Sequence, residues 1–370
     1  MSNFKDLGIK NDFVKGLKEL NIVTPTQIQE EVIPMLLSTT TDLVGQAQTG
    51  TGKTAAYGLP LLHLIDPKKQ KIQGLILCPT RELGQQVAKQ LFRFTKYTDK
   101  IFTEAIYGGA PIDKQIANLK RPTHIVVATP GRLIDMVKRK AVDLEHVKTI
   151  ILDEADEMLS MGFKKELDQI LDFIPNSQQT WLFSATLPHG IREIINEHMS
   201  DDAHRIEVNN KDVVNKNISH QYILCDEIEK LNVLIQFINS QKGKRGIIFC
   251  KTKAATNKLT KQLLAKNVAV DCIHGDLLQK ERDKAMRAFK NESLQLLVAT
   301  DIAARGIDVA ELSFVVHFQL PDKEEYYTHR SGRTARAGKN GLSLSIVTSF
   351  ELRQLRYFER ALGINLDQIT

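Results

Sequence analysis

The sequence predicts an α/β fold made of two tandem domains, each a mostly parallel sheet with helices on both faces. Short runs rich in Val, Ile, Leu and Phe alternate with longer segments of helical pattern. These runs are almost continuously apolar, as expected for strands that are covered on both faces. The pattern stops once, in the polar stretch 209–216, and then restarts. We therefore expect domains at 1–208 and 217–370, joined by a linker at 209–216.

The expected strands and helices follow in order. Near the N-terminus, a helix around 13–20 precedes a second helix that begins at Gln27, after the capping segment Thr24-Pro25-Thr26. The strands expected in the first half are 42–45, 74–78, 101–107, 124–128, 149–152 and 181–183, with helices such as 83–94 and 163–173 between them. Those expected in the second half are 220–224, 246–249, 268–271, 294–299, 314–317 and 342–346. Parallel strands place their carboxyl ends at one edge, where ligands bind.

Composition limits the class of protein. The chain has 370 residues, 42% of them hydrophobic and 25% charged, which is globular and long enough for two domains. The net charge of +6 suits a polyanionic partner but does not establish one. The four cysteines lie apart, with no C-x-x-C, and indicate reduced, buried thiols. No apolar run approaches the ~20 residues that span a bilayer, so we expect a cytoplasmic protein with no membrane partner.

The stretch 47–54, Ala-Gln-Thr-Gly-Thr-Gly-Lys-Thr, has the features of a phosphate-binding loop between a strand and a helix. Gly50 and Gly52 allow backbone N–H groups to approach an oxyanion, and the helix N-terminus adds its positive dipole end. Lys53 would reach the β- and γ-phosphates, and the Thr54 hydroxyl would ligate Mg²⁺. The alternative is a Gly-rich turn with a surface lysine. The expected nucleotide-binding residues are Gln48, Thr49, Gly50, Thr51, Gly52, Lys53 and Thr54.

Two carboxylates, Asp153 and Glu154, directly follow an expected buried strand. In a protein with a phosphate-binding loop, the first would hold Mg²⁺ and the second would position or deprotonate an attacking water. A helix-capping Asp-Glu pair is the alternative. Other polar clusters occur at expected strand ends, namely 79–82, 108–109, 129–132 and 184–186. Together they would form one continuous functional edge.

The second half contributes the segment 329–336, His-Arg-Ser-Gly-Arg-Thr-Ala-Arg. Arg333 and Arg336 are three residues apart and would share one face if this segment is helical, so both could meet one phosphate. An arginine supplied from another domain stabilises the transition state of phosphoryl transfer. A solvated basic helix face, or a passive phosphate-binding patch, is the alternative.

Several signals are individually weak. Gln29 could read the edge of an adenine and Phe4 could stack on it, although a surface glutamine and a core phenylalanine are the ordinary interpretations. In the second half, the stretch 299–308 follows a strand and ends in Gly306 and Asp308, which could contact a sugar or phosphate. Further polar groups at strand ends or helix starts are Lys251, Thr252, His274, Gly275, Asp276, Gln279 and Arg282.

Taken together, these residues resemble the DEAD-box RNA helicase family from Phe4 to about Gly341. Phe4 and Gln29 resemble its adenine-reading motif, and 47–54 matches its form of the phosphate-binding loop. Asp153-Glu154-Ala155-Asp156 is its namesake motif. By resemblance, the RNA-binding residues are Pro79, Thr80, Arg81, Gly108, Gly109, Thr129, Pro130, Gly131 and Arg132 in the first domain, and Thr252, Gly275, Gln279, Arg282, Thr300 and Asp301 in the second.

The resemblance implies two RecA-like domains that close on ATP, Mg²⁺ and single-stranded RNA, separate short duplexes locally and release them after hydrolysis. Its implied catalytic residues are Lys53, Asp153, Glu154, His329, Arg333 and Arg336, and its interdomain coupling residues are Asp156, Ser184 and Thr186. Binding should be salt-dependent and largely sequence-independent. We expect a monomeric core that works with RNA-processing or ribosome-assembly proteins. Ser331, where the family usually has Ile, and Ala335, where it usually has Gly, are departures.

Three rival functions stay open on sequence grounds. An ATP-gated RNA clamp would close without unwinding, and an unwinding assay separates it from a helicase. A DNA translocase of the same superfamily is disfavoured by Phe4, Gln29 and the namesake motif. A non-catalytic nucleotide-binding relic is disfavoured because the expected catalytic lysine, carboxylates and arginines are all present.

Overall fold

The computed structural model describes residues 3–48, 50–174, 179–208, 217–304, 312–335 and 340–369. The chain divides into two compact units, Met1–Asn209 and Asn210–Thr370, and each is described by itself. The linker predicted at 209–216 lies outside the described residues. Within the described helices, none combines the length and apolarity that crossing a membrane requires.

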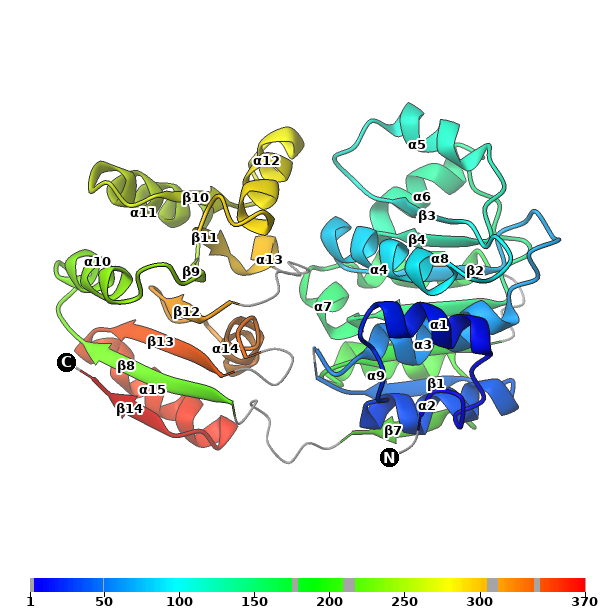
Figure 1. Ribbon diagram of the computed structural model, residues 1–370, viewed down its shortest axis with the longest axis horizontal. Helices are drawn as coiled ribbons and strands as arrows, with labels where there is room; N and C mark the ends of the chain where they lie inside the picture. The colour runs from blue at the N-terminus through cyan, green and yellow to red at the C-terminus, as the bar shows by residue number, and fades with distance from the viewer. Residues whose placement is uncertain are drawn as a thin grey trace. The chain divides into compact units, whose positions relative to one another are not determined.

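The first unit is built on a seven-stranded sheet (Figure 1). Its strands are β1 (Leu43–Gln46), β2 (Gly74–Leu77), β3 (Thr103–Ile106), β4 (Ile125–Ala128), β5 (Thr149–Asp153), β6 (Gln179–Ser184) and β7 (His204–Glu207). They lie in the order β3-β4-β2-β5-β6-β1-β7, and each pairing is parallel. The carboxyl ends of all seven strands therefore meet at one edge.

Helices cover both faces of this sheet. Consecutive strand residues point to opposite faces and therefore belong to two different hydrophobic clusters. Ile76 belongs to one hydrophobic cluster and its neighbours Leu75 and Leu77 to the other. Helices α1 (Asn11–Glu19), α2 (Gln27–Ser38), α3 (Lys53–Leu64) and α4 (Arg81–Phe94) pack on the first cluster. Helices α5 (Ile112–Leu119), α6 (Pro130–Lys138), α7 (Ala155–Ser160), α8 (Lys164–Asp172) and α9 (His189–His198) pack on the second.

The second unit repeats the plan with a second seven-stranded parallel sheet. Its strands are β8 (Ile218–Leu224), β9 (Gly246–Cys250), β10 (Val270–Ile273), β11 (Leu296–Thr300), β12 (Phe314–His317), β13 (Gly341–Val347) and β14 (Leu366–Gln368), in the order β10-β11-β9-β12-β13-β8-β14. Helices α10 (Lys230–Ser240) and α11 (Lys253–Ala265) cover one face. Helices α12 (Gln279–Lys290), α13 (Asp301–Ala304), α14 (Glu324–Ser331) and α15 (Ser349–Leu362) cover the other (Figure 1).

The predicted fold class is confirmed, and most strands were located within two residues of their ends. The Thr24-Pro25-Thr26 cap is also confirmed, since α2 begins at Gln27 with a capping box between Thr26 and Gln29. The prediction missed β7 and β14. Both are short edge strands, and most of their residues are exposed, so neither has the apolar run that marks a buried strand.

Candidate functional site

The phosphate-binding loop connects β1 to α3, as predicted. Gly50 and Gly52 have φ values of +83° and +92°, a region that side chains disfavour, so glycine is required there. Lys53 is buried and its Nζ donates to the Ala47 carbonyl at 2.9 Å. The Thr51 hydroxyl donates to the Gln48 carbonyl at 2.8 Å. The loop is thus held in its curved shape by its own polar groups, and Thr54 follows at the second position of α3.

Gln29 packs against this loop. Its Nε2 donates to the Gly52 carbonyl at 3.0 Å, and its Oε1 accepts from the Thr26 N–H at 3.0 Å. A Cβ on Gly52 would lie 2.3 Å from Gln29 Nε2, so the contact itself requires glycine. Among the described residues, Gln29 keeps one amide hydrogen and one lone pair of Oε1 for a ligand. Phe4 is 2% exposed and lies in the first core cluster. Thr49 lies outside the described residues.

Asp153 is the last residue of β5 and is 3% exposed. Its Oδ2 accepts a hydrogen bond from the Tyr57 hydroxyl of α3 at 2.7 Å. Its Oδ1 is buried without a hydrogen-bond partner among the described residues. Burial raises the pKa of Asp153 to about 6, although Lys53 and Tyr57 act in the opposite direction. A buried carboxylate oxygen without a partner is suited to a cation.

Glu154 follows with φ 52° and ψ 52°, a left-handed conformation that costs a residue with a side chain about 1 kcal/mol or more. This turn reverses the chain between β5 and α7. Asp156, two residues later, accepts from both the N–H and the hydroxyl of Thr186 at 2.9 Å. The Asp156 N–H donates to Ser184 Oγ at 3.2 Å, and this hydroxyl donates to the Thr186 carbonyl at 2.7 Å. The three predicted coupling residues therefore form one hydrogen-bonded cluster.

The RNA-binding residues predicted in the first domain gather at the ends of β2, β3 and β4. Arg132 of α6 donates to the Ala110 carbonyl at 3.2 Å and to Gln115 Oε1 at 3.0 Å. These bonds hold the turn at Gly108 and Gly109 beside α6. Thr80 caps α4, where its Oγ1 accepts from the Leu83 N–H at 3.3 Å. The remaining members start these helices or lie beside them: Pro79, Arg81, Thr129, Pro130 and Gly131.

The order of strands separates two groups of residues. β3, β4 and β2 are neighbours, and the residues at their ends are those predicted to bind RNA. β5, β6 and β1 are also neighbours, and their ends present Asp153, the coupling cluster and the phosphate-binding loop. The first sheet therefore places the residues predicted to bind nucleotide beside those predicted to bind RNA along one edge.

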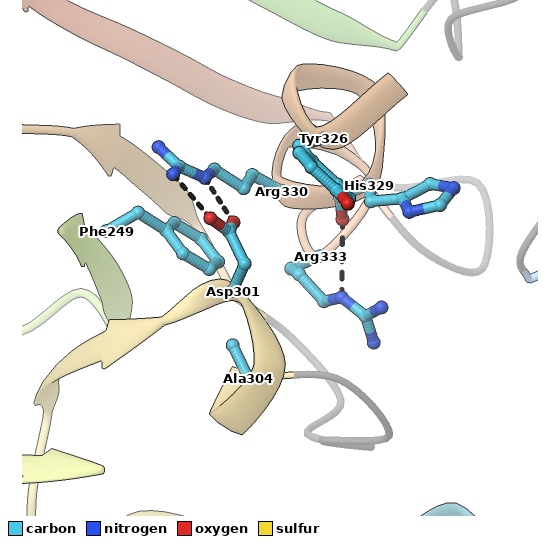
Figure 2. Close-up of a pocket in the computed structure, with 7 residues that line it drawn as sticks. All are labelled: Phe249, Asp301, Ala304, Tyr326, His329, Arg330 and Arg333. Carbon is cyan, nitrogen blue, oxygen red and sulfur yellow. Dashed lines mark hydrogen bonds and ion pairs between the residues drawn. The ribbon is translucent and has the colours of Figure 1, made fainter. Parts of the chain in front are cut away.

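In the second unit, the buried Arg330 and the partly buried Asp301 form an ion pair (Figure 2). Arg330 Nε and Nη2 lie 2.5 and 2.7 Å from the two carboxylate oxygens, and Nη1 donates to the Gln319 carbonyl at 2.7 Å. The guanidinium also lies over the Phe249 ring, 5.1 Å from its centroid. Both oxygens of Asp301 are thus engaged inside the unit. In this structure, Asp301 therefore holds α14 against α13 through its ion pair with Arg330.

Arg333 lies beyond the end of α14, which stops at Ser331. The condition under which Arg333 and Arg336 would share a helical face is therefore not met at Arg333, because Gly332 caps the helix before it. Arg333 is 7% exposed, and its Nε donates to the His329 carbonyl at 3.3 Å. Figure 2 shows the Arg333 guanidinium and the His329 imidazole projecting away from the Arg330–Asp301 pair. Arg336 lies outside the described residues.

Ser331, the departure from the family pattern, belongs to a buried polar network. Its Oγ lies 2.9 Å from Ser343 Oγ and 3.4 Å from His317 Nε2. His317 stacks on Tyr327 with ring centroids 4.4 Å apart, and burial lowers the His317 pKa well below its ordinary value. The imidazole is therefore neutral at physiological pH. Sequence reasoning missed this network, because each of its members is separated in the chain from the others.

The other residues predicted to bind RNA in the second unit differ in exposure. Thr252 caps α11 and is exposed, as is Gly275. Gln279 begins α12 and donates to Asp283 at 2.6 Å. Arg282 is 5% exposed and donates to the Ala303 carbonyl at 3.1 Å, so it ties α12 to α13 instead of presenting its charge at the surface. Thr300, which ends β11, is buried, and Gly306 and Asp308 lie outside the described residues.

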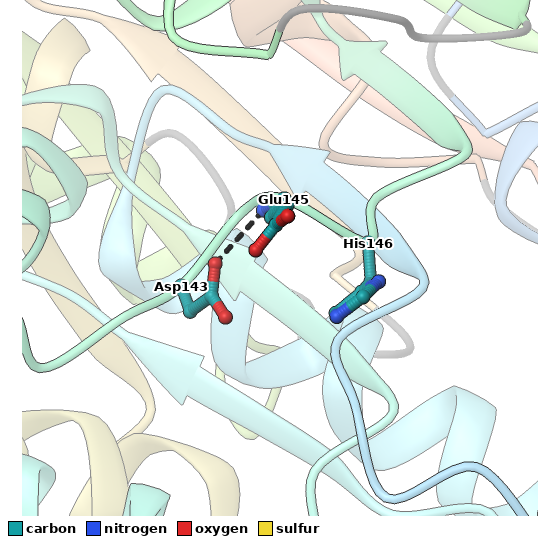
Figure 3. Close-up of side chains that lie close together, drawn as sticks. All are labelled: Asp143, Glu145 and His146. Carbon is teal, nitrogen blue, oxygen red and sulfur yellow. Dashed lines mark hydrogen bonds between the residues drawn. The ribbon is translucent and has the colours of Figure 1, made fainter.

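A cluster of Asp143, Glu145 and His146 lies on an exposed loop (Figure 3). Its internal geometry is that of a turn, since Asp143 Oδ1 accepts from the Glu145 N–H at 2.9 Å. Lys71 Nζ already lies 3.7 Å from the other Asp143 oxygen. Asp168, Glu197 and His198 form a second such group, and Lys164 lies within 3.8 Å of both of its carboxylates. We assign a metal to neither cluster.

Comparison with known proteins agrees with this geometry. Residues 26–194 match the DEAD/DEAH box helicase family, and residues 229–338 match the helicase conserved C-terminal domain. A protein of Bacillus cereus named DEAD-box ATP-dependent RNA helicase CshA is 42% identical over 369 residues, which cover 100% of this chain and 70% of that protein. A Limosilactobacillus reuteri protein, ATP-dependent RNA helicase CshA, is 41% identical over 364 residues, which cover 98% and 72%.

Solved structures are similar over the whole chain. Dbp5 of S. cerevisiae, bound to RNA and ADP BeF3, has a TM-score of 0.92 and 30% identity, covering 100% of this chain and 96% of that one. Mss116p, bound to ssRNA and AMP-PNP, has a TM-score of 0.89 and 28% identity, with 100% and 80% covered. The fold, the site and these relatives lead to one conclusion. The chain belongs to the DEAD-box family of ATP-dependent RNA helicases.

Proposed function

We propose that this chain uses ATP hydrolysis to separate short RNA duplexes, with the nucleotide held by the first unit and arginines supplied by the second. The observation that carries the proposal is the arrangement at one sheet edge of the phosphate-binding loop, Asp153 and the Asp156–Ser184–Thr186 cluster. The Dbp5 and Mss116p structures, solved with RNA and nucleotide, support the same assignment for this chain.

In the proposed reaction, backbone N–H groups of the loop and Lys53 bind the β- and γ-phosphates. Asp153 and Thr54 would hold Mg²⁺, which neutralises charge that develops on the phosphate oxygens. Asp153 Oδ1, which has no hydrogen-bond partner among the described residues, supports this fit, because a buried carboxylate oxygen is the kind of ligand that Mg²⁺ prefers. Glu154 positions or deprotonates the attacking water. We expect Arg333 and Arg336 to stabilise the transferred phosphoryl group, and His329 to act with them.

For RNA, we propose contacts mainly to phosphates and 2′-hydroxyl groups. Gly108, Gly109 and Gly131 are exposed, and backbone N–H groups there would bind phosphate without reading sequence. In the second unit, Thr252, Gly275 and Gln279 are proposed to contact RNA directly, whereas Arg282 and Asp301 position the elements around them. Arg132 acts in the same way on the first unit's turn.

We also propose that the core acts as a monomer in the cytoplasm, with RNA-processing or ribosome-assembly proteins as partners. The four cysteines support a reducing compartment, since all are free, and Cys78, Cys250 and Cys272 are buried. Burial also raises the pKa of Cys78 well above its ordinary value, so this thiol is inert.

Unwinding of an RNA duplex with a single-stranded overhang tests the proposal against an ATP-gated clamp. Strand release should require ATP and should be largely lost when Glu154 is replaced by glutamine. RNA that is retained with ATP but never unwound would favour the clamp. Release of a matched DNA duplex at the same rate would favour a DNA translocase.

A further inference from the structure

Tyr57 contacts the carboxylate to which we assign the metal. It lies in α3, four residues after Lys53, and is fully buried. Its hydroxyl donates to Asp153 Oδ2 at 2.7 Å, and its ring lies against Phe183 of β6 with centroids 5.2 Å apart. The ring is fixed by packing, so the hydroxyl is held in one place. Nothing in the sequence distinguishes this tyrosine from an ordinary core aromatic in an apolar helix.

The hydrogen bond makes the two oxygens of Asp153 different. Oδ2 is occupied by the phenol, whereas Oδ1 is buried with no hydrogen-bond partner among the described residues. A hydrogen bond to one oxygen restricts rotation of the carboxylate and leaves the other oxygen with the larger acceptor capacity for a ligand. An unpaired buried oxygen is otherwise costly, and native structures keep such groups mainly at functional sites.

We propose that Tyr57 is a positioning residue that holds Asp153 so that Oδ1 is the oxygen offered to the divalent cation of the bound nucleotide. This inference rests on the proposed function, because it takes Asp153 as the metal-binding carboxylate. The phenol does not touch the metal. It fixes the carboxylate before the metal arrives, so that less conformational entropy is lost on binding.

A purely structural role would be different. Tyr57 would then fill the core between α3 and β6, with Asp153 merely satisfying its hydroxyl. Loss of the hydroxyl would lower stability and leave metal affinity unchanged. The substitution Tyr57→Phe separates the two, because it removes only one oxygen atom and keeps the packed ring.

The experiment measures Mn²⁺ binding in the presence of ADP by electron paramagnetic resonance, on the full chain. We expect Tyr57→Phe to weaken Mn²⁺ binding roughly three- to tenfold, which is the range for one lost hydrogen bond of ordinary net strength. Binding of a fluorescent ADP analogue with the metal removed by chelator should change less than about twofold. In steady-state ATPase assays, the Mg²⁺ concentration for half-maximal rate should rise, and the rate at saturating Mg²⁺ should recover.

Tyr222→Phe is the matched control. Tyr222 is also buried, and its hydroxyl donates to Gln368 at 2.9 Å and accepts from Arg356 at 2.8 Å, but it lies in the second unit. The Tyr222→Phe variant should have a lower thermal stability than the wild type and the same Mn²⁺ affinity. Wild-type or tighter Mn²⁺ affinity in Tyr57→Phe, or an equal loss of metal-free ADP binding, would overturn the inference. Asp153→Asn tests the underlying function: if it keeps Mn²⁺ affinity, the metal assignment itself fails.

Discussion

Replacing Asp301 with asparagine should destabilise the second unit by about 3 kcal/mol, because it breaks a buried ion pair and leaves one charge without its counterion. Arg330 is 1% exposed on its side chain and Asp301 is 22% exposed, so solvent screens the pair little. Both N–O distances, 2.5 and 2.7 Å, are those of a bidentate pair. Asparagine has the same shape but presents an NH₂ group to the guanidinium in place of one oxygen.

The assay is urea denaturation followed by two signals. Far-UV circular dichroism reports on both units, whereas the single tryptophan, Trp181, is buried in β6 of the first unit. With an m-value of about 2 kcal/mol/M, a loss of 3 kcal/mol moves the second unit's midpoint down by about 1.5 M. The Trp181 transition should move much less.

Asp322→Asn provides the matched control. Asp322 also pairs with a cation, Lys251, at 2.7 Å, but its side chain is 80% exposed. The same change there should cost less than about 1 kcal/mol. If Asp301→Asn costs no more than this control, the ion pair does not stabilise α14 and our reasoning about the Arg330 site is refuted.

Three further predictions concern the active edge and the buried network. Glu154→Gln should bind ATP and RNA yet turn over very slowly, and fast turnover in single-turnover assays would remove Glu154 from its role. Ser331→Ile should lower the free energy of unfolding by about 1–3 kcal/mol, because a larger apolar group replaces a hydroxyl that is hydrogen-bonded to Ser343. An unchanged melting temperature would contradict this prediction. With metal removed, Asp153→Asn should raise stability at pH 7.5. The pKa of Asp153 in the folded protein, about 6, lies above the ordinary 3.8, so the ionised carboxylate lowers the free energy of unfolding by roughly 2–3 kcal/mol above pH 6. The stability gained by Asp153→Asn should therefore shrink as the pH falls toward 4. Unfolding is monitored by Trp181 fluorescence. An equal stability difference between Asp153→Asn and wild type at pH 7.5 and at pH 4 would contradict this prediction.

Much of the fold could be predicted from sequence because parallel strands buried on both faces are apolar along their whole length. The ends of these strands could be predicted too, since a polar residue directly after an apolar run marks the point where the strand ends and the chain is no longer buried. This placed Asp153, Thr80 and Ser184 correctly at the carboxyl ends of strands in the first sheet. The edge strand β7 has no apolar run, so the same reasoning could not find it.

The parts that escaped prediction depend on contacts between distant residues. Tyr57 and Asp153 are 96 residues apart, and no local pattern links them. The order of strands in the sheet, which separates the residues predicted to bind nucleotide from those predicted to bind RNA, is a property of the packed chain. Arg282 was predicted to bind RNA, but its guanidinium is buried and donates to the Ala303 carbonyl of α13. Burial of a long charged side chain depends on its neighbours in space.

The most direct test of the central claim is steady-state ATP hydrolysis at fixed low salt, measured for the protein alone, with single-stranded RNA, and with DNA of the same sequence. The account predicts strong stimulation by RNA and little by DNA. Equal rates in all three conditions would contradict it, because the arginines of the second unit would then not respond to RNA.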